Sequence, residues 1–367
     1  MKHYILFFCY LLFFLLLLLT TIYSYSLLDL NLTFFNLPLW ETFRTNIIQI
    51  GYFHRNISSI MYIVIILGLF LFHHLFLRLY KELDIFKLTM MICFLLFFSY
   101  PFLSHDLFSY MFDAKIFTEY HQNPYLHRPM EYTNDPWLRF MHWTHRTYPY
   151  GPSFLILTLL PSVLGFGKFI LTFFAFKLLF VAAYLGGVYA LNKVNKKWAI
   201  IFATHPLVLI EGLISTHNDL IAVSLALLGS YLVLSNKNIL GRLLLLLSGG
   251  IKYTTLPILF ISKNKIINTG IFLSLLLLTI YICITLAIQP WYFLTFFGFI
   301  LFYEKVETKF NLFLFGLLLS YAPFLLYGNW NTENIILKNS IILVFLSLNI
   351  AYLLSKKFIF YKMKFGS

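Results

Sequence analysis

Long apolar segments separated by short polar ones constrain this chain more than any other feature of its sequence. The first runs from Tyr4 to Tyr23, and similar segments recur into the C-terminal region. A helix of about 20 apolar residues crosses the ~30 Å of hydrocarbon in a membrane, and a helix satisfies its own backbone hydrogen bonds there. With 60% hydrophobic and 11% charged residues, the chain is unlike a soluble globular domain. The sequence therefore predicts an all-α polytopic membrane protein.

We expect about 11 transmembrane helices together with re-entrant or interfacial helices. The expected spans are 4–23, 57–77, 88–103, 168–191, 198–214, 220–235, 240–261, 266–288, 292–302, 310–327 and 335–354. The apolar segment 153–164 would be only about 18 Å long as a helix, so we expect it to be re-entrant or interfacial. Gly249-Gly250 and Pro257 predict that 240–261 is a broken pair that returns to its starting side.

The basic residues set the expected orientation of these helices. Most Lys and Arg residues lie in short loops and in the C-terminal tail, and the positive-inside rule places such loops in the cytoplasm. The expected inner segments are 78–87, 192–197, 236–238, 262–265, 303–309 and 355–367. Loops 24–56 and 104–152 would then lie outside. The net charge of +13 follows from this topology, so no nucleic-acid partner is expected.

The large outer loop, 104–152, is the most polar stretch between two apolar runs. It holds five of the 14 carboxylates and five of the 11 histidines. At 3.6 residues per turn Asp106 and Asp113 share one face and Phe108 and Phe112 the opposite one, which predicts a helix lying in the membrane interface with its carboxylates toward water. The segment 123–125 and the segment 148–152 are proline turns. The alternative is an ordinary water-facing loop with an amphipathic start.

Two further polar positions interrupt apolar segments on the outer side. Ser215-Thr216-His217-Asn218-Asp219 follows Glu211 by one turn, and Lys252 lies next to the expected helix break. A lysine at membrane depth usually has an anionic partner because the unpaired charge costs ~2.5–3.5 kcal/mol. Two structural alternatives stay open: Lys252 could extend to the interface, and Asn218 or Asp219 could cap the next helix.

Three stretches together resemble a known family. They are SHDLFSYMFDAKIF…NPY…YPYGP, THPLVLIEGLISTHNDLIAVSLALLGSYL and GGIKYTTLPILF. The first resembles the first outer loop of GT-C polyprenol-phosphate-sugar-dependent glycosyltransferases, such as bacterial alpha-mannosyltransferases and the mannosyltransferase of glycosylphosphatidylinositol assembly. The resemblance covers about residues 100–262. It implies a GT-C-like helix bundle with a catalytic module at 88–262, preceded by a transmembrane pair (1–87) and followed by C-terminal transmembrane helices (263–367).

The resemblance also implies roles for particular residues. An acidic residue at the position of Asp106 is the catalytic base, and we expect Asp113, His105 and Tyr110 to support it. Lys252, Arg146 and Arg128 are expected to hold the donor phosphate. The expected loop and substrate contacts are Asn123, Tyr125, Tyr148, Gly151, His217, Asn218, Asp219 and Trp291. Some relatives carry a second acidic residue where this chain has His105, so no metal or other cofactor is expected, although the sequence leaves a divalent metal open.

The predicted function is a membrane glycosyltransferase that moves a hexose, with mannose favoured, by an inverting displacement. Its expected partners are a polyprenyl-phosphate-linked sugar donor, a lipid or glycan acceptor, and membrane lipids. The expected location is a bacterial plasma membrane, with the catalytic loop on the extracytoplasmic side and the C-terminus in the cytoplasm. The alternative is a transporter or flippase of a lipid-linked glycan, since such proteins also use broken helices and isolated charges.

Overall fold

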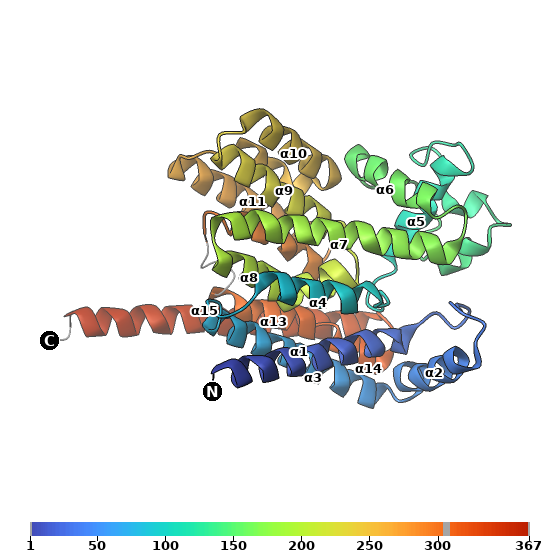
Figure 1. Ribbon diagram of the computed structural model, residues 1–367, viewed down its shortest axis with the longest axis horizontal. Coiled ribbons are helices and arrows are strands. Elements are labelled where there is room, and N and C mark those ends of the chain that lie inside the picture. Colours follow the sequence, from blue (N-terminus) through green and yellow to red (C-terminus); the bar gives the residue numbers. More distant parts are fainter. Residues whose placement is uncertain (1, 304–308, 366–367) are drawn as a thin grey trace.

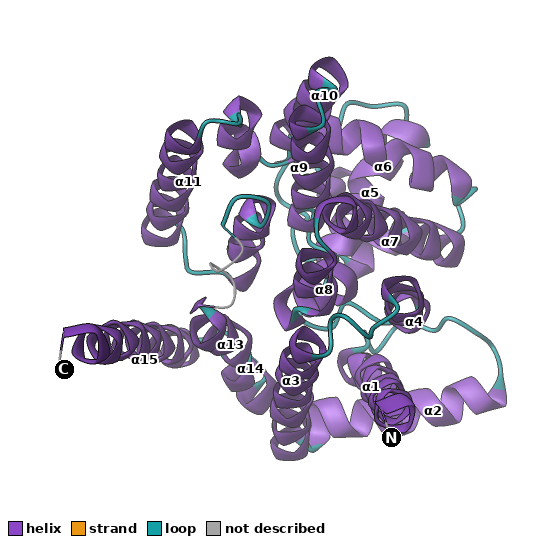
Figure 2. Cartoon of the chain, turned by 60° about the vertical axis from the view of Figure 1, so that its left-hand side comes forward, coloured by secondary structure: helices purple, strands orange, loops and turns teal. Residues whose placement is uncertain are grey.

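The computed structural model describes the backbone of residues 2–303 and 309–365, and within these ranges the chain is helical without a β-strand (Figures 1 and 2). This confirms the all-α class. The α-helices are α1 (Lys2–Ser24), α2 (Pro38–Ile48), α3 (Arg55–Arg78), α4 (Ile85–Phe97), α5 (Asp106–Thr118), α6 (Pro152–Leu164), α7 (Phe169–Val194), α8 (Lys196–Thr204), α9 (Asp219–Leu234), α10 (Asn238–Ile251), α11 (Lys265–Thr285), α13 (Asn311–Leu319), α14 (Ala322–Tyr327) and α15 (Thr332–Phe365). The 3₁₀ and π segments are η1 (Tyr25–Leu27), η2 (Gln49–Phe53), η3 (Pro129–Glu131), η4 (Pro136–Phe140), η5 (Val208–Ile214), η6 (Tyr253–Phe260) and η7 (Pro290–Phe299).

Among the described residues, five helices are long and apolar enough to span a membrane: α1, α3, α7, α11 and α15. The pair α8 and η5 adds a sixth if it is one span, bent by 66°. The expected count of about 11 full spans is therefore not confirmed. Several expected spans are shorter helices; α4, for example, has 13 residues, about 20 Å at 1.5 Å per residue, against ~30 Å of hydrocarbon.

Four of the basic segments, 78–87, 192–197, 236–238 and 262–265, lie toward one end of the helix bundle, as the orientation argument predicts (Figure 1). The Lys196 ammonium donates to the Lys81 carbonyl oxygen at 3.0 Å, and the Lys263 ammonium donates to Asn236 Oδ1 at 2.8 Å. The start of α1 and the far end of α15 lie toward this end, whereas α2 and the loop that follows α5 lie at the other (Figure 1). The helix α2 falls in a segment expected to be a loop; Pro38 occupies its first turn, where proline is well tolerated. Which end faces the cytoplasm stays a prediction.

The chain between α9 and α11 confirms the prediction that 240–261 is a broken segment whose second half turns back. Helix α10 continues through both glycines to Ile251, and the break comes at Lys252 rather than at Gly249-Gly250. The chain then runs back beside α10, because the Arg242 guanidinium donates to the carbonyl oxygens of Leu259 and Ile261. The returning chain places Lys252 at the end of the bundle opposite the 236–238 loop.

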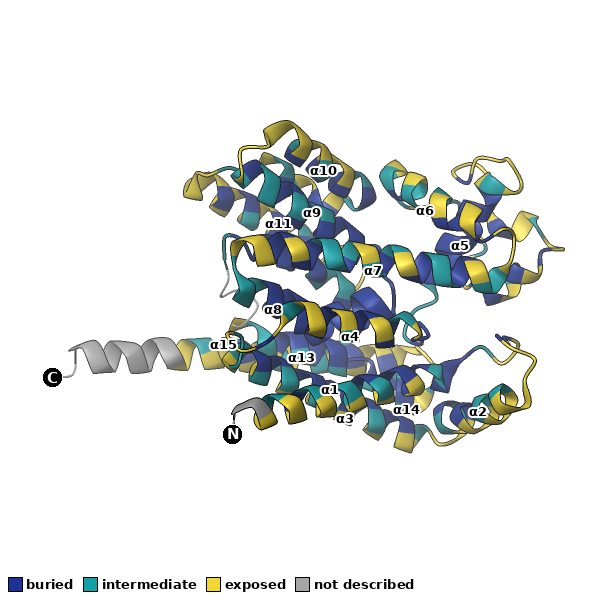
Figure 3. Ribbon diagram, viewed as in Figure 1, coloured by how far each residue is buried: buried dark blue, intermediate teal, exposed yellow. Residues whose placement is uncertain are grey.

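Helix α5 confirms the predicted helix at the start of the large loop, but its surroundings differ from the prediction. Residues Leu107 to Ile116 are all buried, on both faces of the helix, as the dark colour of α5 shows (Figure 3). The expected interfacial helix with carboxylates in water is therefore wrong for Asp113, which is 4% exposed. The reason is tertiary packing, since α6, α7 and the loop residues cover the face that the sequence pattern assigned to water.

Helix α6 packs on α5, and whether it crosses the membrane stays a prediction. Phe154 near its start lies edge-on against Tyr110, with ring centroids 4.8 Å apart. Near its end, Ser162 Oγ lies 2.8 Å from Thr118 Oγ1. Both ends of α6 therefore lie along α5, at the loop end of the bundle. At 13 residues, α6 is also too short for the hydrocarbon thickness.

Candidate active site

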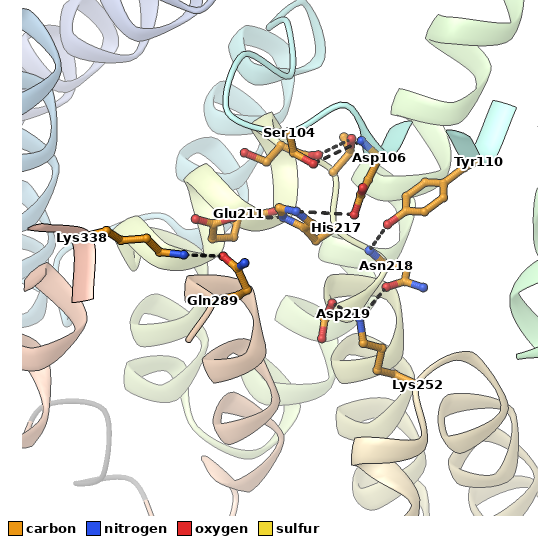
Figure 4. A network of polar contacts seen from close by, with 12 residues as sticks. Ser104, Asp106, Tyr110, Glu211, His217, Asn218, Asp219, Lys252, Gln289 and Lys338 are labelled. Atoms are coloured by element: carbon orange, nitrogen blue, oxygen red, sulfur yellow. Dashed lines mark hydrogen bonds and ion pairs between the residues drawn. The ribbon is translucent and has the colours of Figure 1, made fainter. Parts of the chain in front are cut away.

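Four segments that are distant in the sequence meet at the loop end of the bundle (Figure 4). Asp106 begins α5, and the 215–219 segment joins η5 to α9. Lys252 follows the last residue of α10, and Trp291 lies in the first turn of η7. The structure therefore brings together the carboxylate helix, the polar cluster and the lysine at the helix break, as the sequence predicts. We call this group, with Glu211, the polar network.

His217 connects two carboxylates at the centre of the polar network. Its Nδ1 lies 3.0 Å from Glu211 Oε2, and its Nε2 lies 3.8 Å from Asp106 Oδ2. The ring stacks on the Trp291 indole, with centroids 4.2 Å apart and planes inclined by 17°. Trp291 therefore uses one face of its ring to hold His217, a contact that differs from the sugar contact expected of it.

The backbone that carries His217 is irregular for a reason visible in the sequence. The His205-Pro206 pair ends α8, and the chain turns by 66° into the π-helical η5. Thr216 then adopts a left-handed conformation, with φ of +56°, which a β-branched residue rarely takes. The Lys177 ammonium, buried in α7, donates to the Leu213 carbonyl oxygen and supports this bend. Strained backbone held by surrounding structure is common at functional sites.

Lys252 has the anionic partner that its depth predicts. Its ammonium lies 2.8 Å from Asp219 Oδ2 and 3.2 Å from Asn218 Oδ1. The lysine side chain is 16% exposed and that of Asp219 only 1%. The alternative in which Lys252 extends to the interface is therefore wrong. The capping alternative is not observed either, because Asn218 precedes α9 without a side-chain cap hydrogen bond.

Aromatic residues of the loop form a layer behind Asp106. The Tyr110 ring lies edge-on to Tyr150, and the Asn218 N–H donates to the Tyr110 hydroxyl at 3.4 Å. Tyr148 is buried and packs edge-on against Tyr150. These rings contact protein, so they position the loop. Gly151 has a packing role as well, because a Cβ there would lie 1.9 Å from the Gly250 carbonyl oxygen.

The remaining loop residues lie farther out. Asn123 Oδ1 accepts from the Tyr125 N–H at 3.0 Å and so forms the predicted turn. The Tyr125 hydroxyl donates to the Tyr150 carbonyl oxygen, also at 3.0 Å. Arg128 is exposed, with its N–H bonded to Glu131, and the structure does not bring it to the polar network. Arg146 is half-buried and lies over the Trp143 ring at 4.6 Å.

Two of the expected supporting residues are uncharged at neutral pH. Burial raises the pKa of Asp113 to about 8, although the Arg146 charge opposes this shift and the Asp106 charge adds to it. Burial, together with His142, lowers the pKa of His105 to about 3. The two histidine rings stack with centroids 3.6 Å apart. His105, which precedes Asp106 in the chain, and Asp113, two turns farther along α5, are thus neutral groups.

Comparison with known proteins identifies the family. The model of the family described as "Alpha-(1->6)-mannopyranosyltransferase, N-terminal domain" matches residues 36–264, more than half of the chain. The chain belongs to this family. It is therefore a glycosyltransferase of the mannosyltransferase type, and the family match favours an enzyme over the transporter alternative. No curated protein and no solved structure matched the chain.

The family segment of this mannosyltransferase includes most, but not all, of the polar network. Asp106, Glu211, His217, Asp219 and Lys252 lie within residues 36–264, whereas Trp291 lies beyond them. The C-terminal helices therefore complete a site that the family segment begins.

The expected site omitted two features. Glu211 is completely buried in η5 and belongs to the polar network, and its signal is a single carboxylate inside an apolar run. The second feature is the Lys338 ammonium of α15, which donates to Gln289 Oε1 at 2.9 Å and interacts electrostatically with Glu211. Lys338 can be recognised in the sequence in the same way, because it is a single charged residue within an apolar segment.

A cavity of about 770 Å³ lies among the C-terminal helices of the mannosyltransferase. Most of its lining is aliphatic or aromatic and comes from α11, η7, α13 and α15, including Phe272, Phe293 and Phe313. Ile288, which precedes Gln289, and Ile342, one turn after Lys338, also line it. The Lys338–Gln289 pair therefore lies beside the cavity.

The expectation that this mannosyltransferase uses no metal, with a divalent metal left open, stays a prediction. Across residues 2–303 and 309–365, no three His, Cys, Asp or Glu side chains are grouped so that they could hold a metal ion. The charged groups beside Asp106 pair with one another instead.

Proposed function

We propose that this mannosyltransferase moves mannose from a polyprenyl-phosphate donor to an acceptor hydroxyl on the extracytoplasmic side. Asp106 is the general base, and Lys252 holds the donor phosphate. The reaction inverts the anomeric carbon in one displacement. The family match supports the sugar, and the geometry of the polar network supports the assignment of roles.

The relative exposure of three carboxylates carries the proposal. In the polar network the Asp106 side chain is 19% exposed, whereas Glu211 is 0% and Asp219 is 1% exposed. Asp106 is thus the carboxylate of this network that a substrate can reach. It also stands in the first turn of α5, where the helix dipole favours an anion. A general base must be ionised and within reach of the proton that it takes.

Lys252 suits a phosphate because its ammonium is not saturated. An ammonium has three N–H donors, and Asn218 and Asp219 accept from two of them. The third donor can meet a phosphate oxygen as negative charge builds on the leaving group. Asp219, fixed by the same contact, keeps the ammonium in place before the donor arrives.

The lipid part of the proposed donor matches the apolar cavity. A polyprenyl chain is purely apolar, and a cavity of about 770 Å³ is within the usual size range of ligand sites. The Lys338–Gln289 pair gives this cavity a polar end beside Glu211. The apolar lining therefore fits the lipid chain of the donor, whereas the proposed phosphate contact lies at Lys252.

The chemical step needs only groups of this chain and its substrates. The acceptor hydroxyl gives its proton to an Asp106 oxygen while its own oxygen bonds to the anomeric carbon. The bond between that carbon and the phosphate oxygen breaks, and the electron pair leaves with the phosphate. Lys252 stabilises the added negative charge. The base and the leaving group lie on opposite faces of the sugar, as an inverting displacement requires.

Replacement of Asp106 tests the proposal. Asp106→Asn keeps the size of the side chain but cannot take a proton, so label transfer from radiolabelled polyprenyl-phosphate mannose should fall by ~10²–10⁴. Donor binding should persist, because the phosphate contacts lie at Lys252. Asp113→Asn is the matched control: amide replaces a carboxyl that is already neutral at pH 7, so transfer should fall far less. Wild-type transfer by D106N would overturn the assignment of the base.

A further inference from the structure

His217 meets carboxylates at both edges of its ring. Glu211 of η5 faces Nδ1, and Asp106 of α5 faces Nε2. Asp219 of α9 is a third carboxylate that interacts electrostatically with the ring. The His217 side chain is 1% exposed, so the protein rather than bulk water determines its protonation.

The protonated ring fits these surroundings better than the neutral ring does, although Nδ1 also lies 3.3 Å from the Glu211 carbonyl oxygen. A neutral imidazole has one donor and one acceptor nitrogen, while ionised carboxylates only accept. A neutral His217 would therefore turn a lone pair toward Asp106 or Glu211. Burial lowers the pKa of His217, but the contact with Glu211 and the charges of Asp106 and Asp219 outweigh burial and raise it above its usual value.

Trp291 fixes the orientation of this ring. The indole lies parallel to the imidazole, with centroids 4.2 Å apart. A cation over the face of tryptophan is stabilised by the ring quadrupole, so the stack favours the charged form too. Among the described residues Nε2 has no hydrogen-bond partner, which leaves its proton for the nearby Asp106 carboxylate.

We infer that His217 is a positioning residue whose positive charge keeps Asp106 ionised and oriented as the base. The inference rests on the proposed role of Asp106 and extends it, because the pH range of the reaction is then set by a Glu211–His217–Asp106 chain. Without the imidazolium, Asp106 loses the nearby positive charge that stabilises its carboxylate form and fixes its orientation.

The test is the pH dependence of transfer. Initial rates at subsaturating radiolabelled polyprenyl-phosphate mannose are measured in membranes that contain the full-length protein. His217→Gln should move the acidic limb of the rate profile to higher pH by ~1–3 units, the usual effect of one charge within 4–6 Å of a carboxylate. Glu211→Gln should move it in the same direction by less, because His217 keeps its ring but holds its proton less tightly.

A matched control separates charge from shape. His105→Gln also removes an imidazole beside Asp106, but that ring is neutral across the assay range, so the acidic limb should stay in place even if the rate changes. If the H217Q and wild-type profiles superimpose after scaling, His217 has only a structural role and the inference fails. If H217Q does not accumulate as folded protein, the E211Q profile decides in the same way. Wild-type transfer by D106N would instead defeat the proposed function, so the two failures are distinguishable.

Discussion

Replacement of Lys252 separates its two possible roles, structural pairing and phosphate binding. The ammonium lies 2.8 Å from Asp219 Oδ2, and Asp219 is 1% exposed. Lys252→Met removes the cation and leaves a buried carboxylate without its charge partner. Breaking a buried pair from one side costs ~3–5 kcal/mol, so K252M should lose stability as well as activity. Loss of activity in K252M alone would therefore not identify a phosphate contact.

The informative variant is the pair Lys252→Met with Asp219→Asn. It removes both charges, and removal of both partners of a buried pair costs far less than removal of one. Thermal unfolding in detergent should then return most of the way to wild type. Donor transfer should stay at the K252M level, because the phosphate still lacks its ammonium. Lys252→Arg should retain part of the transfer, since the charge remains but the compact ammonium is lost.

The comparison of K252M with K252M/D219N can refute the phosphate-binding role of Lys252. If K252M/D219N regains both stability and transfer, Lys252 serves only to neutralise Asp219, and the donor phosphate binds elsewhere. If K252M unfolds at the wild-type temperature, the Lys252–Asp219 pair does not stabilise the fold, and the expected cost of ~3–5 kcal/mol for breaking it is wrong. Donor binding measured on each variant distinguishes a binding defect from a defect in the transfer step.

Two further predictions follow from burial and from topology. Burial raises the pKa of Asp113 from its ordinary 3.8 to about 8, so the folded protein holds a proton that the unfolded chain releases in this pH range. The free energy of unfolding of wild type should therefore fall as the pH rises from about 4 to about 8, and it should fall by more than that of D113N. Single cysteines at Lys196 and Lys263 should resist an impermeant thiol reagent applied from outside, while one at Asn134 should react. Labelling at Lys196 from outside would overturn the prediction that 153–164 does not cross the membrane.

The parts of the site that sequence reasoning found share one physical basis. A charge in an apolar segment is costly unless it is paired, so isolated charges indicate that partners lie nearby. Lys252 with Asp219 is such a pair. Proline and asparagine chemistry predicted the turn at 123–125, and helical periodicity predicted α5, because both depend on neighbours in the sequence.

The features that were not predicted depend on tertiary packing. Apolar content does not distinguish a helix that crosses the membrane from a shorter one covered by other helices, so the sequence alone does not fix the number of spans, and the described residues do not confirm about 11. The polar face of α5 suggested water, but α6, α7 and the loop cover it. Lys338 was assigned to an ordinary span because nothing local links it to Gln289, 49 residues earlier in the chain.

Glu211 and His217 show why local periodicity could not identify the central contact. In an α-helix six residues turn a side chain by about 600°, which leaves it roughly 120° away from its starting direction. The two side chains would then point apart. In the structure η5 is a π-helical segment, Thr216 is left-handed, and the His217 N–H donates to the Glu211 carbonyl oxygen at 3.0 Å. This closed turn brings the imidazole back over the carboxylate, so the irregular backbone at Thr216 is what allows a buried Glu211 to act on Asp106 through His217.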